Sequence, residues 1–210
     1  MARPRSIDDS VILAAAREVF LERGFAGTTA EVARRAGVSE GSIFNRFGNK
    51  QGLFRAAVQP KIEDATWIEN LENRVGVGEV TEHLTEIGLG GISFFQEKIP
   101  MIMMAWSNAD NLGGCPPMPG RVPLEVLGRL AKYFEAEMRL GRMRRVDAEI
   151  VARTFLAAIH NYAFLEVLFK QQGQLPLPAG MYIRGMIDAL WNGIAPTPGD
   201  SAPEAAKSEV

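Results

Sequence analysis

Residues 28–47, TTAEVARRAGVSEGSIFNRF, constrain the fold of this chain more than any other stretch. They have the pattern of two short helices joined by a tight turn, which Gly37 supplies because glycine adopts a positive φ without steric cost. Ser39 follows the turn and can cap the second helix with its hydroxyl. A second helix held in this way, with a free outer face, is the element that enters the major groove of DNA. The alternative is an ordinary corner between two helices, because helix-turn-helix patterns are short.

The flanking residues favour the DNA-binding interpretation. Residues 7–24 have the spacing of an amphipathic helix that ends in Gly-Phe, and residues 47–54 read FGNKQGLF. In its succession of Gly-Phe, Thr-Thr, Val-Ala, Ala-Gly-Val-Ser, Gly-Ser-Ile-Phe, Arg-Phe and Asn-Lys-Gln, the segment 6–58 resembles the N-terminal DNA-binding domain of the TetR family of bacterial regulators. The rest of the chain agrees with that family only in length and helical pattern.

Helical spacing without sustained strand alternation predicts an all-α protein. We expect a three-helix DNA-binding head with the start of a connector helix in residues 1–58, a helical effector-binding and dimerisation domain in 59–194, and a disordered tail in 195–210. Ser6 is expected to cap the first helix. A fourth helix is expected over residues 50–73, kinked or interrupted at Pro60. Further helices are predicted at about 79–98, 100–109, 122–140, 147–171 and 180–193, with a Pro- and Gly-rich loop at 108–123.

The charges are divided unevenly between the two ends of the chain. Residues 1–55 carry nine Lys and Arg against six Asp and Glu, whereas the whole chain has a net charge of −2. This asymmetry fits a DNA-facing head on an acidic body. Cys115 is the single cysteine, so no intrachain disulfide can form. Without an apolar signal sequence or an apolar run of about 20 residues, we expect a cytoplasmic bacterial protein that does not bind membranes.

The resemblance implies which residues of the head meet DNA. Ser42, Asn45 and Arg46 are donors that can reach base edges or phosphates. Gly41 lets the backbone approach the DNA closely, and Lys50 stands at a helix start that can bind a phosphate. The complete implied set is Thr28, Thr29, Ser39, Glu40, Gly41, Ser42, Phe44, Asn45, Arg46 and Lys50.

Three departures from the family pattern affect this set. The family usually has Tyr where Phe44 stands and often has His where Arg46 stands. The segment 24–32 is also one residue shorter than the family pattern, which leaves open by one position how the two threonines align with the family. Glu40 could accept a hydrogen bond from cytosine, or it could simply favour the positive end of its helix. These departures leave the operator sequence undetermined.

Two apolar segments of the body are expected to form a dimer interface. Residues 150–169 are apolar on nearly every face, which predicts burial on all sides, and residues 181–194 repeat the pattern. In a domain of this size one side most simply meets a second subunit, and the resemblance implies the same four-helix arrangement. The alternative is the centre of a monomer core. The expected interface residues are Phe155, Ile159, Tyr162, Leu165, Tyr182, Met186 and Leu190.

An aromatic and methionine cluster marks a candidate effector pocket. Methionine suits adaptable cavities, and the resemblance implies a small apolar effector, whereas ordinary core packing is the alternative for each residue. Gly88, Gly90 and Gly91 indicate close helix packing, a kink or space for a ligand, and the sequence leaves these three open. The candidate pocket residues are Phe94, Phe95, Met103, Met104, Trp106 and Asn161.

Together these patterns predict a homodimeric regulator that binds double-stranded DNA at a near-palindromic operator. We expect a repressor whose operator binding is modulated by the effector through the fourth helix. A regulator or scaffold without an effector is the alternative. An enzyme is disfavoured, because the two histidines, His83 and His160, lie far apart in sequence and no HExxH, P-loop, GxGxxG or nucleophile elbow occurs. No cofactor or metal is expected.

Overall fold

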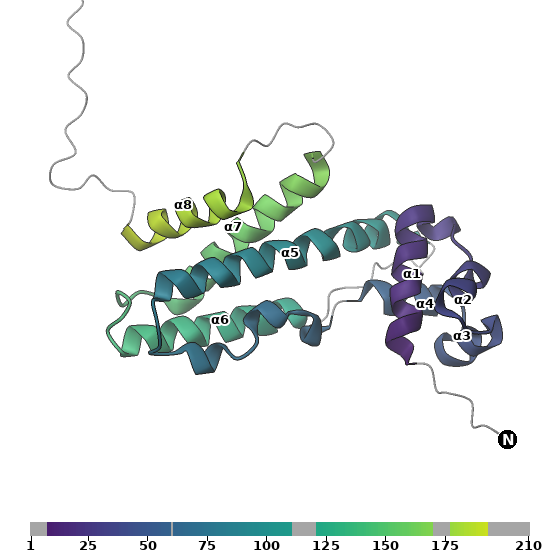
Figure 1. Cartoon of the computed structure of the whole chain (residues 1–210), viewed down its shortest axis with the longest axis horizontal. Helices are drawn as coiled ribbons and strands as arrows, with labels where there is room; N and C mark the ends of the chain where they lie inside the picture. The colour runs from purple at the N-terminus through teal and green to yellow at the C-terminus, as the bar shows by residue number, and fades with distance from the viewer. Residues whose placement is uncertain (1–7, 60, 111–120, 170–176, 193–210) are drawn as a thin grey trace, which may run out of the picture.

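The computed structural model describes residues 8–59, 61–110, 121–169 and 177–192. Within these ranges the only regular elements are α-helices and short 3-10 turns, which confirms the predicted all-α class. Figure 1 shows a head of short helices, α1 to α4, at one end of an elongated body formed by α5 to α8. The predicted tail at 195–210 lies outside the described residues.

Each helix of the head begins at a polar side chain that caps it. The helices are α1 (Asp9–Arg23), α2 (Thr29–Ala36), α3 (Glu40–Phe47) and α4 (Lys50–Val58). Their caps are Asp8, Thr28, Ser39 and Asn49, whose side chains accept hydrogen bonds from backbone N–H groups of the first turn. The expected cap at Ser6 was wrong, because α1 begins two residues later, where the Asp8 carboxylate accepts from the Ser10 N–H at 3.2 Å.

The head has its own hydrophobic core, across which α1 packs against α2 and α4. Phe20 and Phe54 meet at its centre with ring centroids 4.9 Å apart in an edge-to-face arrangement. Ile43 is the one residue of α3 that is fully buried there. Burial of a single face fixes α3 against the head and leaves its opposite face exposed.

The fourth helix is interrupted near Pro60, which was one of the two expected outcomes, but it does not resume in the connector between head and body. Helix α4 ends at Val58, and the chain continues in 3-10 turns η2 (Ile62–Asp64), η3 (Thr66–Ile68) and η4 (Leu71–Arg74). The interruption has a steric cause. Proline at position 60 lacks an N–H and forces the preceding residue out of the helical region, and Gln59 is extended, with φ −73° and ψ 117°.

The body consists of α5 (Val80–Ser107), α6 (Val122–Arg139), α7 (Ala148–Phe169) and α8 (Ala179–Asn192). The separate helices expected at 79–98 and 100–109 are one helix, α5, which continues through Pro100. Its two flanking residues are held in different cores, Ile99 in that of the body and Met101 in that of the head. Pro123 was expected in a loop but opens α6, where a missing N–H costs nothing.

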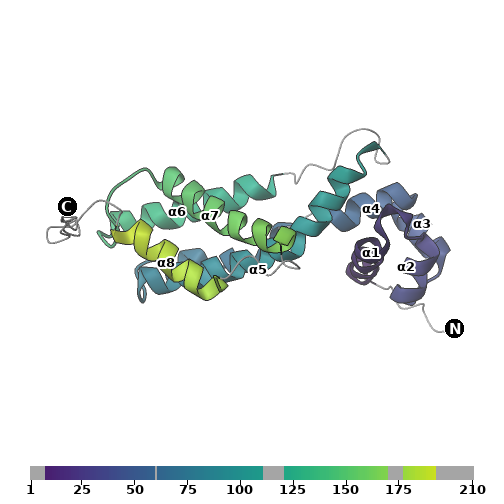
Figure 2. The same ribbon diagram turned by 90° about the horizontal axis from the view of Figure 1, so that it is seen from above.

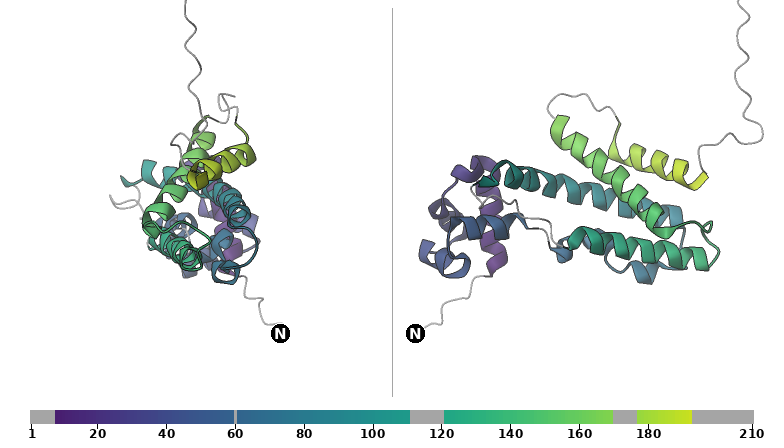
Figure 3. Two further views of the ribbon diagram at one scale, coloured as in Figure 1. Left: turned by 90° about the vertical axis from the view of Figure 1, so that its left-hand side faces the viewer. Right: turned by 180° about the vertical axis from the view of Figure 1, so that it is seen from behind.

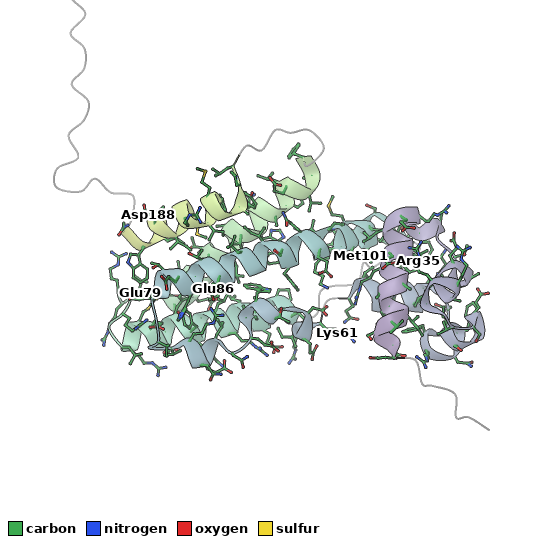
Figure 4. The ribbon with its side chains drawn as sticks, viewed as in Figure 1. Arg35, Lys61, Glu79, Glu86, Met101 and Asp188 are labelled. Atoms are coloured by element: carbon green, nitrogen blue, oxygen red, sulfur yellow. The ribbon has the colours of Figure 1, made fainter. Side chains whose placement is uncertain are left out.

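Helix α5 therefore spans both parts of the molecule. Figures 2 and 3 show it running the length of the body and ending against α1 and α4. Met101 and Ala105 belong to the head core, and Figure 4 labels Met101 at this junction. Within the described ranges, no helix combines the length and apolarity that crossing a membrane requires.

Candidate functional site

Local hydrogen bonds fix how α2 and α3 meet, and we call these two helices with their capped turn (residues 28–47) the α2–α3 frame. The Thr28 hydroxyl accepts from the Glu31 N–H, and the Glu31 carboxylate accepts from the Thr28 N–H at 2.9 Å, so both partners cap the start of α2. Gly37 ends α2 with φ 67°, the left-handed conformation that glycine adopts most easily. Ser39 then caps α3 by accepting from the Ser42 N–H at 3.2 Å. The turn is thus fixed at both ends before any tertiary contact is counted.

The outward face of α3 carries most of the residues expected to meet DNA. Gly41, Asn45 and Arg46 are exposed, and Phe44 is 43% exposed. Ser42 and Lys50 are partly exposed. Such a helix, with one apolar face inward and donors outward, can offer side chains to base edges and phosphates.

Three of the residues expected to contact DNA also form contacts within the head. Thr29 is buried, and its hydroxyl donates to the Glu40 carboxylate, which joins the start of α2 to the start of α3. This bond favours a positioning role for Glu40 over acceptance from a base. Arg46 forms an ion pair with Asp9 of α1, with Nη1 and Oδ1 2.7 Å apart.

The edge of the head near α4 holds a cation at a helix start. Lys50 lies in the first turn of α4, and its Nζ sits 4.6 Å from the centroid of the Phe25 ring. Asn49 caps this helix by accepting from the Gly52 N–H at 2.8 Å. A phosphate at this position would meet both the ammonium group and the positive end of the helix.

On the opposite side of α2, Arg35 forms hydrogen bonds with a carboxylate of α1. Its guanidinium donates to both carboxylate oxygens of Glu22, at 2.8 and 2.9 Å, and this hydrogen bonding lowers the pKa of Glu22 below its usual value. The pair is exposed and supplies little stability, but it orients α2 against α1. Arg35 is labelled on this face of the head in Figure 4.

In the body, the structure brings together Phe94 and Phe95 of the expected effector residues. They pack with Trp67 of η3 and with His160 and Phe164 of α7, and we call these five residues the central aromatic cluster. Neighbouring ring centroids lie between 5.0 Å (Phe95 and His160) and 6.2 Å (Trp67 and Phe95, His160 and Phe164) apart. Partial burial lowers the pKa of His160 below its usual value.

The other expected effector residues do not join this cluster. Met104 packs against the head core. Met103 and Trp106 are 38% and 58% exposed near the end of α5, and Asn161 is exposed on α7. Methionine and aromatic content alone could not show that α5 serves two different cores.

The sequence prediction did not include Trp67, although two glycines of α5 pack directly against it. A Cβ added at Gly90 would lie 2.6 Å from the Trp67 Cβ, and one at Gly91 would lie 2.6 Å from the Ile159 Cδ1. Of the three explanations for these glycines, close packing is therefore the one observed. The indole Nε1 of Trp67 is buried and has no hydrogen-bond partner among the described residues, which calls for an explanation.

The residues expected at a dimer interface fall into three groups. Phe155 and Ile159 are fully buried in the core of their own protomer, so they have no surface to offer a partner. Tyr162 and Tyr182 stack at 4.6 Å, and their hydroxyls donate to the carbonyls of Leu177 and Ala158, which braces α7 against α8. Partly or well exposed positions are Leu165, Met186 and Leu190.

A cleft of about 700 Å³ opens at the end of the body away from the head, and we call it the distal cleft. None of the six expected effector residues lines it. Its walls come from α5, α6, α7, α8 and the connection between α6 and α7. The lining residues are Leu84, Phe134, Gly141, Arg142, Met143, Arg144, Val146, Asp147, Ile150, Val151, Thr154, Phe155, Ile187, Leu190, Trp191 and Asn192.

Models of known protein families match both the head and the body of the chain. The family model for bacterial regulatory proteins of the tetR family matches residues 12–57. The model for the C-terminal domain of AefR-like transcriptional repressors matches residues 118–182. The first match covers α2 and α3 with their capped turn, and the second covers α6 and α7.

Two curated relatives come from Bacillus subtilis. The uncharacterized HTH-type transcriptional regulator YezE is 30% identical over 46% of this chain, and YvkB, also an uncharacterized HTH-type transcriptional regulator, is 39% identical over 34%. The matched region spans half of the length of the former and a third of the latter.

Solved structures share the whole fold at low identity. FadR from Bacillus subtilis in complex with stearoyl-CoA has a TM-score of 0.64 at 18% identity, with 90% of this chain and all of that one covered. GusR from Salmonella enterica has a TM-score of 0.62 at 18% identity, with 91% and 98% covered. At such identities these structures establish the fold alone. The capped α2–α3 frame, the all-helical body and the two family matches lead to one conclusion: this chain belongs to the TetR family of bacterial transcriptional regulators.

Proposed function

We propose that this protein is a repressor that binds a near-palindromic operator as a homodimer and releases it when a small apolar effector binds the body. The observation that carries the proposal is the α3 helix, which presents Gly41, Asn45 and Arg46 outward from a frame fixed by Ile43. A helix held in this way suits the major groove. We assign DNA binding to residues 1–58 and effector binding and dimerisation to 59–194.

We place the dimer interface on the outer faces of α7 and α8. Phe155 and Ile159 are removed from it because they lie in the protomer core. The proposed interface instead includes three exposed small residues, Ala157 on α7 and Gly185 and Ala189 on α8. Small side chains let helices of two subunits approach closely, so that the remaining contacts can form over a long stretch. The tyrosine pair between α7 and α8 would keep these helices aligned.

We place the effector at the central aromatic cluster. A buried donor without a partner costs about 1–3 kcal/mol, and an effector with a carbonyl or similar acceptor would satisfy the indole N–H of Trp67. The aromatic rings would hold its apolar part. The structural neighbour FadR was solved with stearoyl-CoA, which supports an acyl compound as the first class to test here.

The tight packing around Gly90 and Gly91 favours the alternative, a regulator without an effector. A solid centre would leave nothing for a ligand to occupy. The two proposals differ in one measurable respect, because only the first requires the free energy of operator binding to depend on a small molecule.

We propose that the signal passes along α5. The sequence suggested the fourth helix, but α4 ends at Val58 before it reaches the body. Helix α5 contacts the central aromatic cluster through Phe94 and Phe95 and enters the head core with Met101 and Ala105. Between them, Lys98 pairs with Asp64 at 3.3 Å. A rotation of α5 on ligand binding would therefore move the head directly.

Selection of bound DNA from a random pool, followed by footprinting, tests the DNA-binding mode. We expect two half-sites whose centres lie one helical turn, about 34 Å, or a multiple of it apart. A single half-site, or no enriched sequence, would contradict a dimeric operator complex.

The effector site is tested by Trp67→Phe, which removes the N–H and keeps an aromatic ring. The variant should bind the operator as the wild type does, but a long-chain acyl-CoA should release it at a concentration raised about tenfold, as loss of a buried hydrogen bond implies. Trp106→Phe, at an exposed indole, is the matched control. Equal responses of both variants would contradict the assigned site, and operator binding of the wild type that ignores acyl-CoA would favour the regulator without an effector.

A further inference from the structure

The distal cleft lies at the far end of the body, where Figure 4 labels Glu79 and Asp188. Its volume of about 700 Å³ is in the range of small-molecule sites, about 300–1,000 Å³. Phe134, Phe155 and Ile187 form a buried apolar floor. The cleft shares none of its lining residues with the central aromatic cluster.

The rim of the distal cleft is unusually apolar for a protein surface. Ile150 is 64% exposed, Trp191 43% and Val146 41%, and none of the three belongs to the expected dimer-interface residues. Single exposed apolar residues need no explanation, but several around one hollow mark a binding site. The rim therefore requires an apolar occupant.

The charged side chains that line the distal cleft differ in how many hydrogen bonds they already form with other residues. Arg142 donates to the buried Glu137 at 2.7 Å and to the carbonyls of Val77 and Gly78. Asp147 accepts from the Ile150 N–H at 3.0 Å, at the start of α7. Arg144 has no ion pair or hydrogen bond with any described residue, so its charge is the one available to a ligand.

These groups favour an anion over a cation at the mouth of the cleft. The Arg144 guanidinium can form paired hydrogen bonds with a carboxylate. The start of α7, a helix of 22 residues, adds a positive potential there. The Asp147 carboxylate opposes this potential, although its oxygen is already held by the helix.

We propose that the distal cleft is a second ligand site, which binds an aliphatic monocarboxylate. The chain of the ligand lies on the floor of Phe134, Phe155 and Ile187, and its carboxylate pairs with Arg144. The site does not depend on the effector site proposed at the central aromatic cluster, because it uses other residues near the start of α5, whereas Phe94 and Phe95 lie in the middle of that helix. A second copy of the chain, or the chain's own C-terminal residues, would be the competing occupants.

The experiment uses 12-bromododecanoate and the intrinsic fluorescence of the full-length protein. Bromine quenches tryptophan on contact, and the three tryptophans lie in different places: Trp191 at the distal cleft, Trp67 in the central aromatic cluster and Trp106 near the head. We expect a saturable component of the quenching that Trp191→Phe removes and that remains in Trp67→Phe, whether or not the bromo acid also quenches Trp67 at the central aromatic cluster. Quenching that Trp67→Phe abolishes instead would overturn the distal site and locate the fatty acid at the proposed effector site.

The role of the charge is tested with two neighbouring arginines. Arg144→Ala should weaken binding of 12-bromododecanoate about tenfold, as loss of a charge-assisted hydrogen bond implies. Arg145→Ala should have little effect, because Arg145 is exposed but does not line the cleft. Equal affinities of the two variants would overturn the proposal.

The competing occupants are tested in the same assay. The titration is repeated with protein truncated after residue 192 and at concentrations across the dimer dissociation range. Quenching by the untreated full-length dimer supports the proposal. Quenching that appears only after truncation, or only in the monomer, would overturn it and assign the cleft to the C-terminal residues or to a second copy.

Discussion

The head and the body reach the same all-helical structure by different physical means. In the head, short helices start at capping side chains, as in the Thr28–Glu31 capping box, and Gly37 ends α2 in the left-handed conformation. In the body, neither α5 nor α6 has a side-chain hydrogen bond at its N-cap. Gly88, Gly90 and Gly91 of α5 instead fit against Ile183, Trp67 and Ile159, all distant in sequence. Local hydrogen bonds fix the helix starts throughout the head, whereas α5 and α6 depend on long-range packing. Within the body, α7 is the exception, because Asp147 caps it.

This difference teaches which variants should damage which part. Hydrogen bonds at caps are spread along the chain, and each is worth only about 1 kcal/mol. Packing contacts are concentrated, and one methyl group in the wrong place strains two or three neighbours.

The largest effect should come from Ile43→Ala in the head. Ile43 is fully buried, so its truncation should cost about 2–5 kcal/mol, enough to unfold a small head. We expect operator binding to be lost while the body keeps its thermal transition, since the two cores share no residues. Calorimetry should show the head transition shifting alone. Val11→Ala, at an exposed position of α1 outside the expected DNA contacts, is the control, and an equal shift of both transitions would show that the head and body unfold as one unit.

The packing of the body is tested by Gly91→Ala. The added Cβ would lie 2.6 Å from the Ile159 Cδ1, and such overpacking costs about 1–3 kcal/mol. Gly128→Ala on α6 is the matched control, because no atom lies within 4 Å of its added Cβ and the variant should gain up to about 1 kcal/mol of helix stability. Chemical denaturation measures both. A stabilising Gly91→Ala would mean that α5 is not specified by this contact.

The local bonds of the head are tested by Ser39→Ala. Loss of this cap should cost about 1 kcal/mol and weaken operator binding by fraying the start of α3. Ser93→Ala removes an exposed hydroxyl that bonds only to the Leu89 carbonyl of its own helix, and the free energy of unfolding should change by less than about 0.5 kcal/mol. If the two serines proved equivalent in denaturation, caps would not define the head.

The smallest effect concerns the pH dependence of the body. Burial lowers the pKa of His160 in the folded protein below its value of 6.5 in the unfolded chain. As the pH falls through 6.5, the unfolded chain takes up the proton first, so the free energy of unfolding decreases toward acid pH. His160→Phe should reduce this decrease between pH 7 and pH 5.

Other titrating groups act in a different window. The carboxyls of Asp8, Glu22 and Glu31 have folded-state pKa values lowered from 3.8 or 4.5, so the stability they supply is lost only below that range. An unchanged slope between pH 7 and pH 5 in His160→Phe would mean that His160 does not titrate differently on folding.

The same contrast explains what the sequence could reveal. The positions of α2 and α3 followed from the spacing of Thr28, Gly37 and Ser39, because caps and turns depend on residues that are close together in the sequence. The merging of two expected helices into α5 did not, since Ile99 and Met101, which flank Pro100, pack into separate cores that no local pattern indicates. The interruption near Pro60 was expected as an alternative to a kink. The 3-10 turns that follow it were not expected, because they pack against α5 and α6, which lie later in the sequence.

The candidate sites followed the same rule. Local pattern was enough to propose side chains of α3 as DNA contacts, whereas only the structure showed Thr29 bonded to Glu40 and Arg46 paired with Asp9. Trp67 could not be recognised, because its importance depends on two glycines more than 20 residues away. The distal cleft is lined by residues of α5, α6, α7 and α8, so no single segment of the sequence could predict it.

The most direct test of the account is fluorescence anisotropy with the operator recovered by selection, at physiological salt and with excess nonspecific DNA. The account predicts saturable binding of two protomers or a small multiple per operator. Arg46→Ala on α3 should weaken it by about 1–3 kcal/mol, as loss of a base contact does. Arg129→Ala, which removes a surface ion pair of α6, should leave it unchanged. Binding that competitor DNA abolishes, or that both variants weaken equally, would show only nonspecific attraction and would contradict recognition through α3.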